Sequence, residues 1–260
     1  MLKKLIRPLL PKLRRSFEFI FLIEAKITRA WAKSAHKRLL ISQWYMGKNP
    51  EWFDHNIDHY YAWVETGNSL WLERGAFSSM CLKQDGDVLE LCCGDGFNAS
   101  NFYSHRSNSV IAVDFDVSAI KSAKENWHRT NIKFEVADIR TQMPIGKYDN
   151  IIWDAAIEHF TEDEITKLMT DIKERMKSHT VLSGYTLVER DDGIKHIHQH
   201  EYEFQSKEDL MRFLKPHFAN VVVFETIYPS RHNLYFWAAD DETRIPFNCN
   251  WQSMSIAVKG

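Results

Sequence analysis

Short apolar runs alternate with amphipathic segments from residue 87 onward, and this pattern predicts a mostly parallel α/β sheet. Parallel strands that are covered on both faces read as continuous apolar stretches of this length. Helical segments between the first runs would supply the crossover connections that parallel strands need. The last two runs are joined by the five residues 228–232, short enough for an antiparallel hairpin. The predicted strands are Val88–Leu91, Val110–Val113, Lys133–Val136, Asn150–Trp153, Val181–Val188, Asn220–Ile227 and Asn233–Ala238.

Two helices in the second half of the chain have marked starts. Thr161 with Glu164, and Ser206 with Asp209, have the spacing of a capping box. The second helix should end before Pro216, because proline cannot continue a helix. The first should run to about residue 177 with one apolar face, made of Ile165, Leu168, Met169, Ile172 and Met176.

The pattern divides the 260 residues into four parts. Residues 1–42 form a basic amphipathic extension, and residues 43–80 are rich in Trp, Tyr and Phe without strand alternation, which favours a helical cover. Residues 81–242 hold the α/β domain, and residues 243–260 form a tail.

The extension has helical apolar spacing over residues 1–15, although Pro8 and Pro11 argue against one continuous helix. Residues 1–40 contain eleven Lys and Arg against two acids, so they carry about nine positive charges. Such a segment suits an anionic membrane surface, and we expect peripheral contact through it. The alternatives are packing against the body, packing against a second subunit in a homodimer, or a disordered basic tail. No apolar run reaches the roughly 20 residues that span a bilayer.

The net charge and the spacing of the cysteines limit the class of protein. The rest of the chain has 33 acids against 22 Lys and Arg, which does not resemble the basic face of a general nucleic-acid binder. Cys81, Cys92, Cys93 and Cys249 match neither a zinc pattern nor a disulfide framework. We therefore expect reduced thiols in a cytoplasmic protein, held peripherally at the inner membrane face if the extension binds lipid.

A glycine turn and two acids follow three successive predicted strands. Gly94 and Gly96 lie in the turn after the first strand and leave room for a ligand near the backbone. Asp114 ends the second strand and can accept hydrogen bonds from both hydroxyls of a ribose. Asp138 follows the third strand and can accept from an exocyclic adenine amine. The carboxyl ends of parallel strands meet at one edge of a sheet, where ligands bind. Taken singly, Asp114 could cap a helix and Asp138 could be a turn residue.

Residues 86–160 resemble the class I S-adenosylmethionine-dependent methyltransferases. Val88-Leu89-Glu90-Leu91-Cys92-Cys93-Gly94-Asp95-Gly96 is similar to their first motif, and Ile111-Ala112-Val113-Asp114 to the second. Asp138 resembles the adenine-side acid, and the segment from Tyr148 to Phe160 resembles the fourth-strand region with its Glu-His pair. The resemblance implies a Rossmann-like three-layer sandwich whose seven-stranded sheet ends in an antiparallel hairpin.

The resemblance also implies roles for residues at the strand ends. Glu90, Cys92, Gly94 and Gly96 would surround the methionine part of S-adenosyl-L-methionine, with Asp154 nearby. Asp114 would bind the ribose, Phe115 would lie beside the adenine, and Asp138 and Ile139 would reach its amine and ring. The family usually has glycine where this chain has Cys92.

Candidate bases for methyl transfer lie after the fourth and fifth predicted strands. An oxygen nucleophile must lose a proton as it attacks, and histidine is the commonest base near neutral pH. Asp154 and His159 follow the fourth strand. Strand-like alternation in residues 196–200 would place three histidines on one face, with His198 and His200 as candidates. No Cys or carboxylate framework accompanies them, so we expect no metal.

The acceptor is harder to predict than the cofactor. Neither a target-recognition domain nor a basic body is visible, so we expect a small-molecule or carbohydrate acceptor, methylated at oxygen, and no nucleic acid. Four alternatives stay open: a methyltransferase of a lipid-linked substrate at the membrane, a nicotinamide-dependent oxidoreductase, a non-enzymatic membrane protein, and an aminopropyltransferase. The oxidoreductase would share the glycine turn and Asp114 but has no reason for Asp138.

Overall fold

The computed structural model describes residues 10–42, 70–228 and 231–246. The chain forms two compact units, Met1–Glu51 and Trp52–Gly260, and each is described by itself. Most of the predicted aromatic cover, residues 43–69, lies outside the described residues, as do residues 1–9 and 247–260 of the two ends.

The first unit consists, in its described part, of the long helix α2, Leu10–Ile41. Pro11 lies in the first turn of this helix, where its missing N–H would have had no intrahelical partner anyway. Residues 1–9 lie outside the described residues, so the expectation that Pro8 and Pro11 prevent one continuous helix over residues 1–15 stays a prediction. Among the described residues, no helix is both long enough and apolar enough to cross a membrane.

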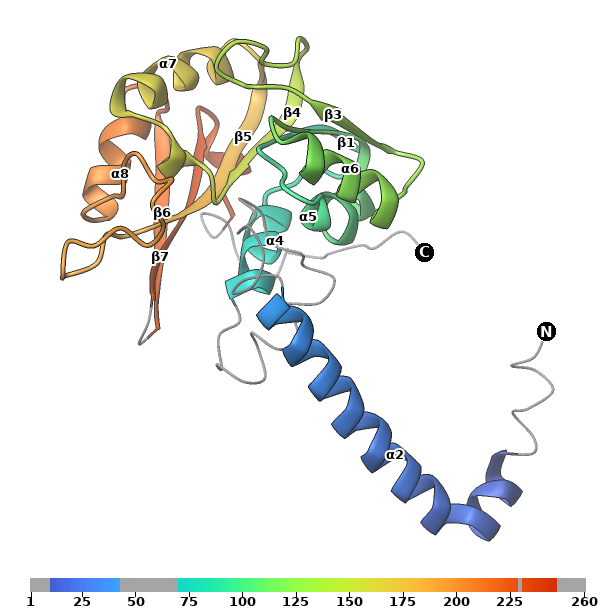
Figure 1. Ribbon diagram of the computed structural model, residues 1–260. Helices are drawn as coiled ribbons and strands as arrows, with labels where there is room; N and C mark the ends of the chain where they lie inside the picture. Colours follow the sequence, from blue (N-terminus) through green and yellow to red (C-terminus); the bar gives the residue numbers. More distant parts are fainter. Residues whose placement is uncertain (1–9, 43–69, 229–230, 247–260) are drawn as a thin grey trace. The chain divides into compact units, whose positions relative to one another are not determined.

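The second unit is built on a seven-stranded sheet, which confirms the predicted fold class (Figure 1). The strand order is β3-β2-β1-β4-β5-β7-β6, and the first five of these strands run parallel. β7 is antiparallel to both β5 and β6, as the short predicted connection requires. The strands are β1 Gly86–Leu91, β2 Ser107–Asp114, β3 Ile132–Val136, β4 Tyr148–Asp154, β5 Met176–Leu187, β6 Asn220–Tyr228 and β7 Arg231–Ala239.

Helices cover both faces of the sheet. Leu89 and Leu91 point into the large core shared with α7 and α8, whereas Val88 points into the core shared with α5 and α6. Successive side chains of one strand therefore pack into hydrophobic cores on opposite faces of the sheet. The result is three layers, with the sheet between two layers of helices. The α-helices of this unit are α4 Leu70–Met80, α5 Phe97–Asn101, α6 Val117–Asn126, α7 Glu162–Lys173 and α8 Lys207–Leu214, and short 3₁₀ turns are η2 Tyr103–His105, η3 Ile157–His159 and η4 Glu242–Arg244.

The two predicted helix starts are found, with one difference in length. Thr161 and Glu164 form the complete capping box of α7. The helix ends at Lys173 rather than near 177, because Arg175 donates to the carbonyl of Asp171 at 2.7 Å and closes the last turn. Met176 is buried as expected, but as the first residue of β5.

The start of α8 keeps only half of the predicted box. The Ser206 hydroxyl accepts from the Asp209 N–H at 3.3 Å. The Asp209 carboxylate turns instead to the Gln205 N–H and the Tyr202 hydroxyl, at 3.1 and 2.8 Å.

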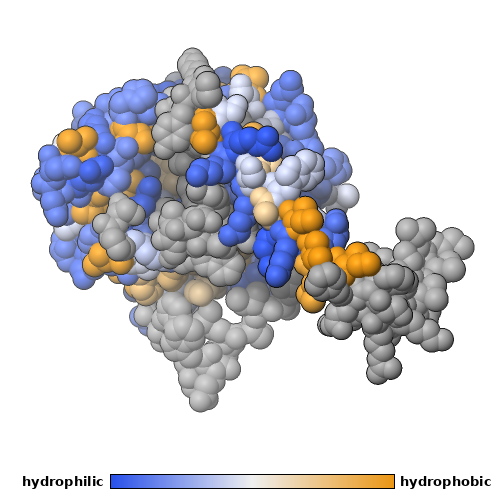
Figure 2. Space-filling view, turned by 60° about the horizontal axis from the view of Figure 1, so that its bottom comes forward, coloured by the Kyte–Doolittle hydropathy of each residue, from blue (hydrophilic) through white to orange (hydrophobic). Residues whose placement is uncertain are grey.

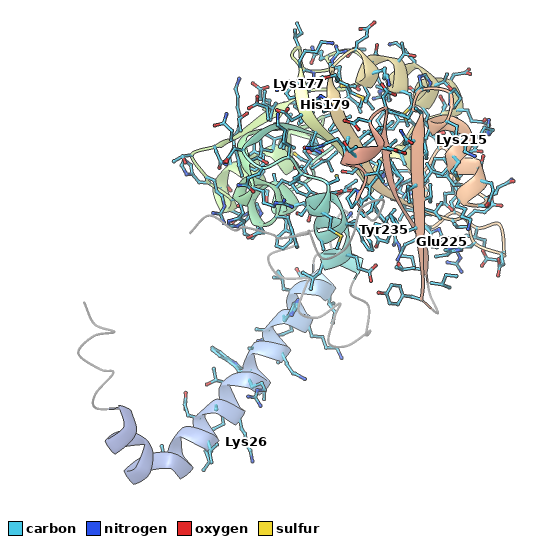
Figure 3. The ribbon with its side chains drawn as sticks, turned by 180° about the vertical axis from the view of Figure 1, so that it is seen from behind. Lys26, Lys177, His179, Lys215, Glu225 and Tyr235 are labelled. Atoms are coloured by element: carbon cyan, nitrogen blue, oxygen red, sulfur yellow. The ribbon has the colours of Figure 1, made fainter. Side chains whose placement is uncertain are left out.

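An ion-pair cluster joins strands at the amino edge of the sheet. Asp149 accepts from Lys83 at 2.6 Å and from Lys177 at 2.7 Å, and its other contact is the Asp87 N–H. Lys177 and His179 mark the beginning of β5, far from the hairpin residue Tyr235 (Figure 3). This edge is stabilised by charge, which leaves the carboxyl edge for ligands.

Gly184 in the middle of β5 has no room for a side chain. A Cβ there would lie 2.2 Å from the backbone oxygen of Trp153 and 2.5 Å from the Phe236 ring. We predict that Gly184→Ala destabilises the fold by about 3 kcal/mol, because the backbone of β4 would have to move. Urea denaturation measures this. Gly193→Ala is the control: it meets no atom within 4 Å, and its positive φ should cost only about 1 kcal/mol. Equal small losses in both variants would contradict the packing argument.

Candidate functional site

The turn after β1 has a left-handed backbone at three positions. Cys92, Gly94 and Gly96 have φ values of 56°, 54° and 77°. A Cβ at position 96 would come within 2.5 Å of Phe134 and 2.9 Å of Ala123. Both conformation and packing thus require glycine at 96. Position 92 has the conformation that favours glycine, which fits the residue type that the resemblance leads us to expect there.

The Asp114 carboxylate ties this turn to the end of β2. Its Oδ2 accepts from the Gly94 N–H at 2.9 Å, and its Oδ1 accepts from the Asp116 N–H at 2.9 Å. Its backbone oxygen accepts from Ala137 N–H at 2.9 Å, just after β3. The ends of three neighbouring strands are therefore held in fixed relation around one side chain.

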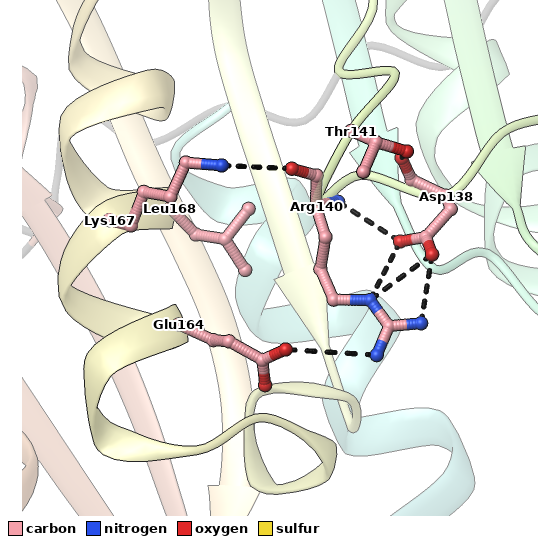
Figure 4. A pocket seen from close by; sticks show the side chains of 6 residues that line it. All are labelled: Asp138, Arg140, Thr141, Glu164, Lys167 and Leu168. Carbon is pink, nitrogen blue, oxygen red and sulfur yellow. Dashed lines mark hydrogen bonds and ion pairs between the residues drawn. The ribbon is translucent and has the colours of Figure 1, made fainter.

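Asp138 lies beside the end of β3 in a pocket next to α7 (Figure 4). The Arg140 guanidinium binds both of its carboxylate oxygens, and these hydrogen bonds lower the pKa of Asp138. Arg140 also faces Glu164, 3.8 Å away. Phe115 is 53% exposed and is open to stacking, whereas Ile139 is buried in the core beneath this edge. The three adenine-side candidates thus differ in access.

Two buried carboxylates, Glu90 and Asp154, lie side by side at the ends of β1 and β4. Asp154 accepts from the Tyr103 hydroxyl at 2.5 Å and from the Ser78 hydroxyl at 3.4 Å. Burial raises the pKa of Asp154 to about 6, and it raises the pKa of Glu90 well above its usual value, with Asp154 adding to the effect. Glu90 Oε2 makes no hydrogen bond within the described part of the chain.

Two arginines flank the Tyr185 ring near this pair. The guanidinium carbons of Arg74 and Arg231 lie 5.6 and 5.9 Å from the ring centroid. Arg231 also donates to the Tyr185 hydroxyl at 2.8 Å. Arg74 is only 7% exposed and acts electrostatically on both Glu90 and Asp154. Neither arginine is an ordinary surface charge. Both arginines are possible anion contacts from the sequence, where a surface charge is the commoner role. Tyr103, by contrast, cannot be found from the sequence, because a lone tyrosine has no local signal.

Two of the candidate bases, His159 and His200, lie next to each other although about forty residues separate them in the sequence. The rings of His159 and His200 lie edge to face, with centroids 4.9 Å apart. His200 is buried, and burial lowers its pKa. His198 is exposed, so the two histidines do not share a face, and the predicted strand-like alternation is wrong. The reason is that Glu203 binds the Nδ1 atoms of both His196 and His200 and bends the segment.

The two cysteines of the turn are packing residues. Burial raises the pKa of both the Cys92 and the Cys93 thiol well above the usual value, so both are protonated. Cys81, Cys92 and Cys93 are all free thiols, which agrees with the prediction for these three; Cys249 lies outside the described residues.

Comparison with known proteins confirms the predicted family resemblance. Residues 88–179 match a family model described as a methyltransferase domain. Ribosomal protein L11 methyltransferase of Thermosipho melanesiensis is 33% identical over 107 residues, covering 40% of this chain and 39% of that protein. Ribosomal RNA small subunit methyltransferase H of Clostridium botulinum is 27% identical over 124 residues, covering 42% and 40%. The chain thus spans about two fifths of the length of these relatives.

Solved structures agree with the fold. The DhpI–SAH complex matches with a TM-score of 0.53 at 16% identity, over 72% of this chain and 90% of that one. An S-adenosylmethionine-dependent methyltransferase from Clostridium acetobutylicum matches with a TM-score of 0.52 at 14% identity, over 72% and 98%. The fold is that of the class I methyltransferases.

The raised pKa of Asp154 predicts a pH-dependent stability. The folded value near 6 exceeds the unfolded value near 3.8, so protonation favours the fold. This contribution is complete below pH 4 and is lost as the pH rises through 6. We predict that the free energy of unfolding of Asp154→Asn, relative to that of the unchanged chain, is about 2 kcal/mol higher at pH 7.5 than at pH 4. Denaturant titrations at both pH values measure this.

Asp149→Asn provides the matched control at the amino edge. Although burial alone would raise its pKa, hydrogen bonds from Lys177 and Lys83 lower the pKa of Asp149. Its contribution to stability is therefore constant above pH 4 and is lost only at lower pH. A difference between Asp154→Asn and the unchanged chain that did not vary with pH would contradict the prediction.

Proposed function

We propose that this chain is an S-adenosyl-L-methionine-dependent methyltransferase whose cofactor site lies at the ends of β1, β2 and β3. The observation that carries the proposal is the placement of Gly94, Asp114 and Asp138 at one edge of a sheet with the methyltransferase strand order. Dinucleotide-binding folds instead have the order 3-2-1-4-5-6 with parallel strands. The antiparallel β7 beside β5 therefore argues against the oxidoreductase.

The buried charges fit the methionine end of the cofactor. That end carries an ammonium, a sulfonium and a carboxylate. Glu90 has a buried oxygen without a hydrogen-bond partner among the described residues, and Asp154 lies next to it, so these two would hold the cations. Arg74 acts electrostatically on both acids and would hold the carboxylate of the cofactor.

The nucleoside end would lie along the ends of β2 and β3. The two oxygens of Asp114 accept from the Gly94 and Asp116 N–H groups, and the same carboxylate would accept from the ribose hydroxyls. Phe115 would stack on the adenine, above the buried Ile139. Asp138 would accept from the adenine amine while Arg140 keeps it ionised.

The chemistry is a methyl transfer from a sulfonium, which the cofactor supplies when bound. The chain must orient the acceptor and help to remove its proton. His159 and His200 are the candidates for this, because they lie next to each other at the carboxyl edge after β4 and β5, whereas His198 is exposed. Asp154 is occupied by Tyr103 and Ser78, which favours a binding role over that of a base.

We propose a small-molecule or carbohydrate acceptor that is methylated at oxygen. The acidic charge of residues 41–260 supports this proposal. The relatives above are named for a ribosomal protein and for ribosomal RNA, so a macromolecular acceptor is the alternative, and the expectation of no nucleic acid is not supported by them.

Calorimetric titration with S-adenosylhomocysteine tests the cofactor site. We expect Asp114→Ala to weaken binding at least about 100-fold, because two charge-assisted hydrogen bonds to the ribose are lost. Asp138→Ala should weaken it about tenfold. Asp116→Ala is the control, since Asp116 only caps α6 and should leave the affinity unchanged. Unchanged affinity in both site variants, or tighter binding of NAD, would overturn the proposed activity.

We further propose that α2 contacts an anionic membrane surface. Ile20, Ile23, Ile27 and Trp31 recur at helical spacing and are between 41% and 72% exposed. On the face seen in Figure 2, orange hydrophobic residues lie next to blue hydrophilic ones. Lys26 is among the basic residues of the helix (Figure 3). An apolar stripe beside basic side chains suits lipid head groups.

Sedimentation with vesicles tests this membrane contact. The full chain should pellet with vesicles that contain phosphatidylserine, and binding should weaken in high salt because the attraction is partly electrostatic. Ile23→Asp with Ile27→Asp should abolish pelleting, whereas the exposed pair Ile145→Asp and Ile194→Asp in the other unit should not. Equal pelleting of all variants would reject the contact.

A further inference from the structure

Three potential metal ligands converge beside the proposed cofactor site. Glu158, His159 and His200 each offer one ligand atom, and these atoms all lie within 4.8 Å of one another. Glu158 and His200 are buried, with exposed fractions of 2% and 3%. Two imidazoles and one carboxylate form a donor set that binds first-row transition metals in many proteins.

Backbone hydrogen bonds hold His200 close to Glu158. The Glu158 carbonyl accepts from the Glu201 N–H at 2.8 Å and from the Tyr202 N–H at 3.1 Å. These two bonds hold the segment after β5 against η3, so His200 arrives next to Glu158 regardless of any ligand. The cluster is thus built into the fold, although its members are distant in sequence.

Outer partners orient the inward-facing atoms. The Nδ1 atom of His200 faces the Glu203 carboxylate, which leaves Nε2 as the nitrogen that can accept. Glu203 is held in turn by the backbone N–H of His196 at 2.7 Å. The Thr186 hydroxyl donates to Oε2 of Glu158 at 2.9 Å, and Oε1 lies 4.0 Å from His200 Nε2. A carboxylate behind a ligating imidazole is the usual outer partner in metal sites.

We propose that Glu158, His159 and His200 bind a divalent transition-metal ion, and that this ion binds the hydroxyl oxygen of the methyl acceptor. The proposal rests on the proposed methyltransferase function. Ligand atoms about 2.1 Å from a metal lie roughly 3 Å apart, so the 4.0 Å gap closes with small side-chain rotations. Three protein ligands leave coordination positions open for substrate.

The position of the cluster suits this role. η3 begins three residues after Asp154, and Glu158 is close enough to act electrostatically on both Asp154 and Cys92. The ion would therefore lie at the same sheet edge as the cofactor turn, on the side of β4 and β5. Adjacent sites for the acceptor and the methyl donor are what a direct transfer requires.

The ion would make the acceptor a better nucleophile. With the ion bound, His159 and His200 would act as its ligands and not as the base. A metal lowers the pKa of a coordinated hydroxyl, so the acceptor would lose its proton to solvent at neutral pH. Its oxygen then forms the bond to the methyl carbon, the carbon–sulfur bond breaks, and its electron pair stays on sulfur. The acceptor class is accordingly a hydroxyl compound, and an acceptor with two neighbouring hydroxyls could fill two open positions.

Thermal unfolding of the full chain with Mn²⁺, Co²⁺ or Zn²⁺ tests metal binding without an acceptor. After treatment with a chelator, the chain should gain about 5–10 °C in Tm when one of these ions is present at 100 times its Kd. Co²⁺ should also produce visible absorption bands. His159→Gln should remove both effects. His198→Gln is the matched control, because His198 is exposed and lies outside the cluster, so it should retain both.

Two results would overturn the proposal. One is an unchanged Tm of the unaltered chain at millimolar concentrations of every ion. The other is equal metal binding by the unaltered chain and His159→Gln, with His200→Asn as a second variant in case either fails to fold. Titration with S-adenosylhomocysteine in the same samples separates the two proposals. If it binds while no metal does, the histidines form a hydrogen-bonded network only, and the methyltransferase function stands.

Discussion

The hydrogen bond from the Gly94 N–H to the Asp114 carboxylate is the contact on which the site depends. It connects a left-handed turn at the end of β1 to the end of β2, and the Asp114 backbone oxygen continues the connection to the segment after β3. A hydrogen bond from a backbone N–H to an ionised carboxylate is stronger than one to a neutral acceptor. One acid therefore aligns three strand ends at the place where the ribose would bind.

Most of the fold could be predicted because its signals are local. The central strand β4 contains an apolar run and is buried along its whole length, and a capping box marks the start of α7 in four residues of sequence. The end of α7 was misplaced because Met176 fits the apolar period of the helix while belonging to β5. Periodicity alone could not distinguish a buried strand residue from the next helical position.

The candidate site was predictable only in part, for the same reason. Acids and glycines at strand ends are visible in sequence, because the topology of a parallel sheet places them together. The approach of His200 to Glu158 depends on backbone hydrogen bonds between distant loops, and the burial of Arg74 depends on α4 packing near β5. Neither has a sequence period, and the strand-like prediction for the histidine segment fails because the anchoring role of Glu203 has no local sequence signal.

The backbone at Cys92 and Ala155 has a consequence for ligand recognition. Both are non-glycine residues with positive φ, 56° and 52°, directly after the adjacent strands β1 and β4. Such conformations persist only where the surrounding structure enforces them. The loops that would surround a ligand are therefore preorganised in the free protein, and binding there loses little backbone entropy, which removes one of the costs that reduce affinity.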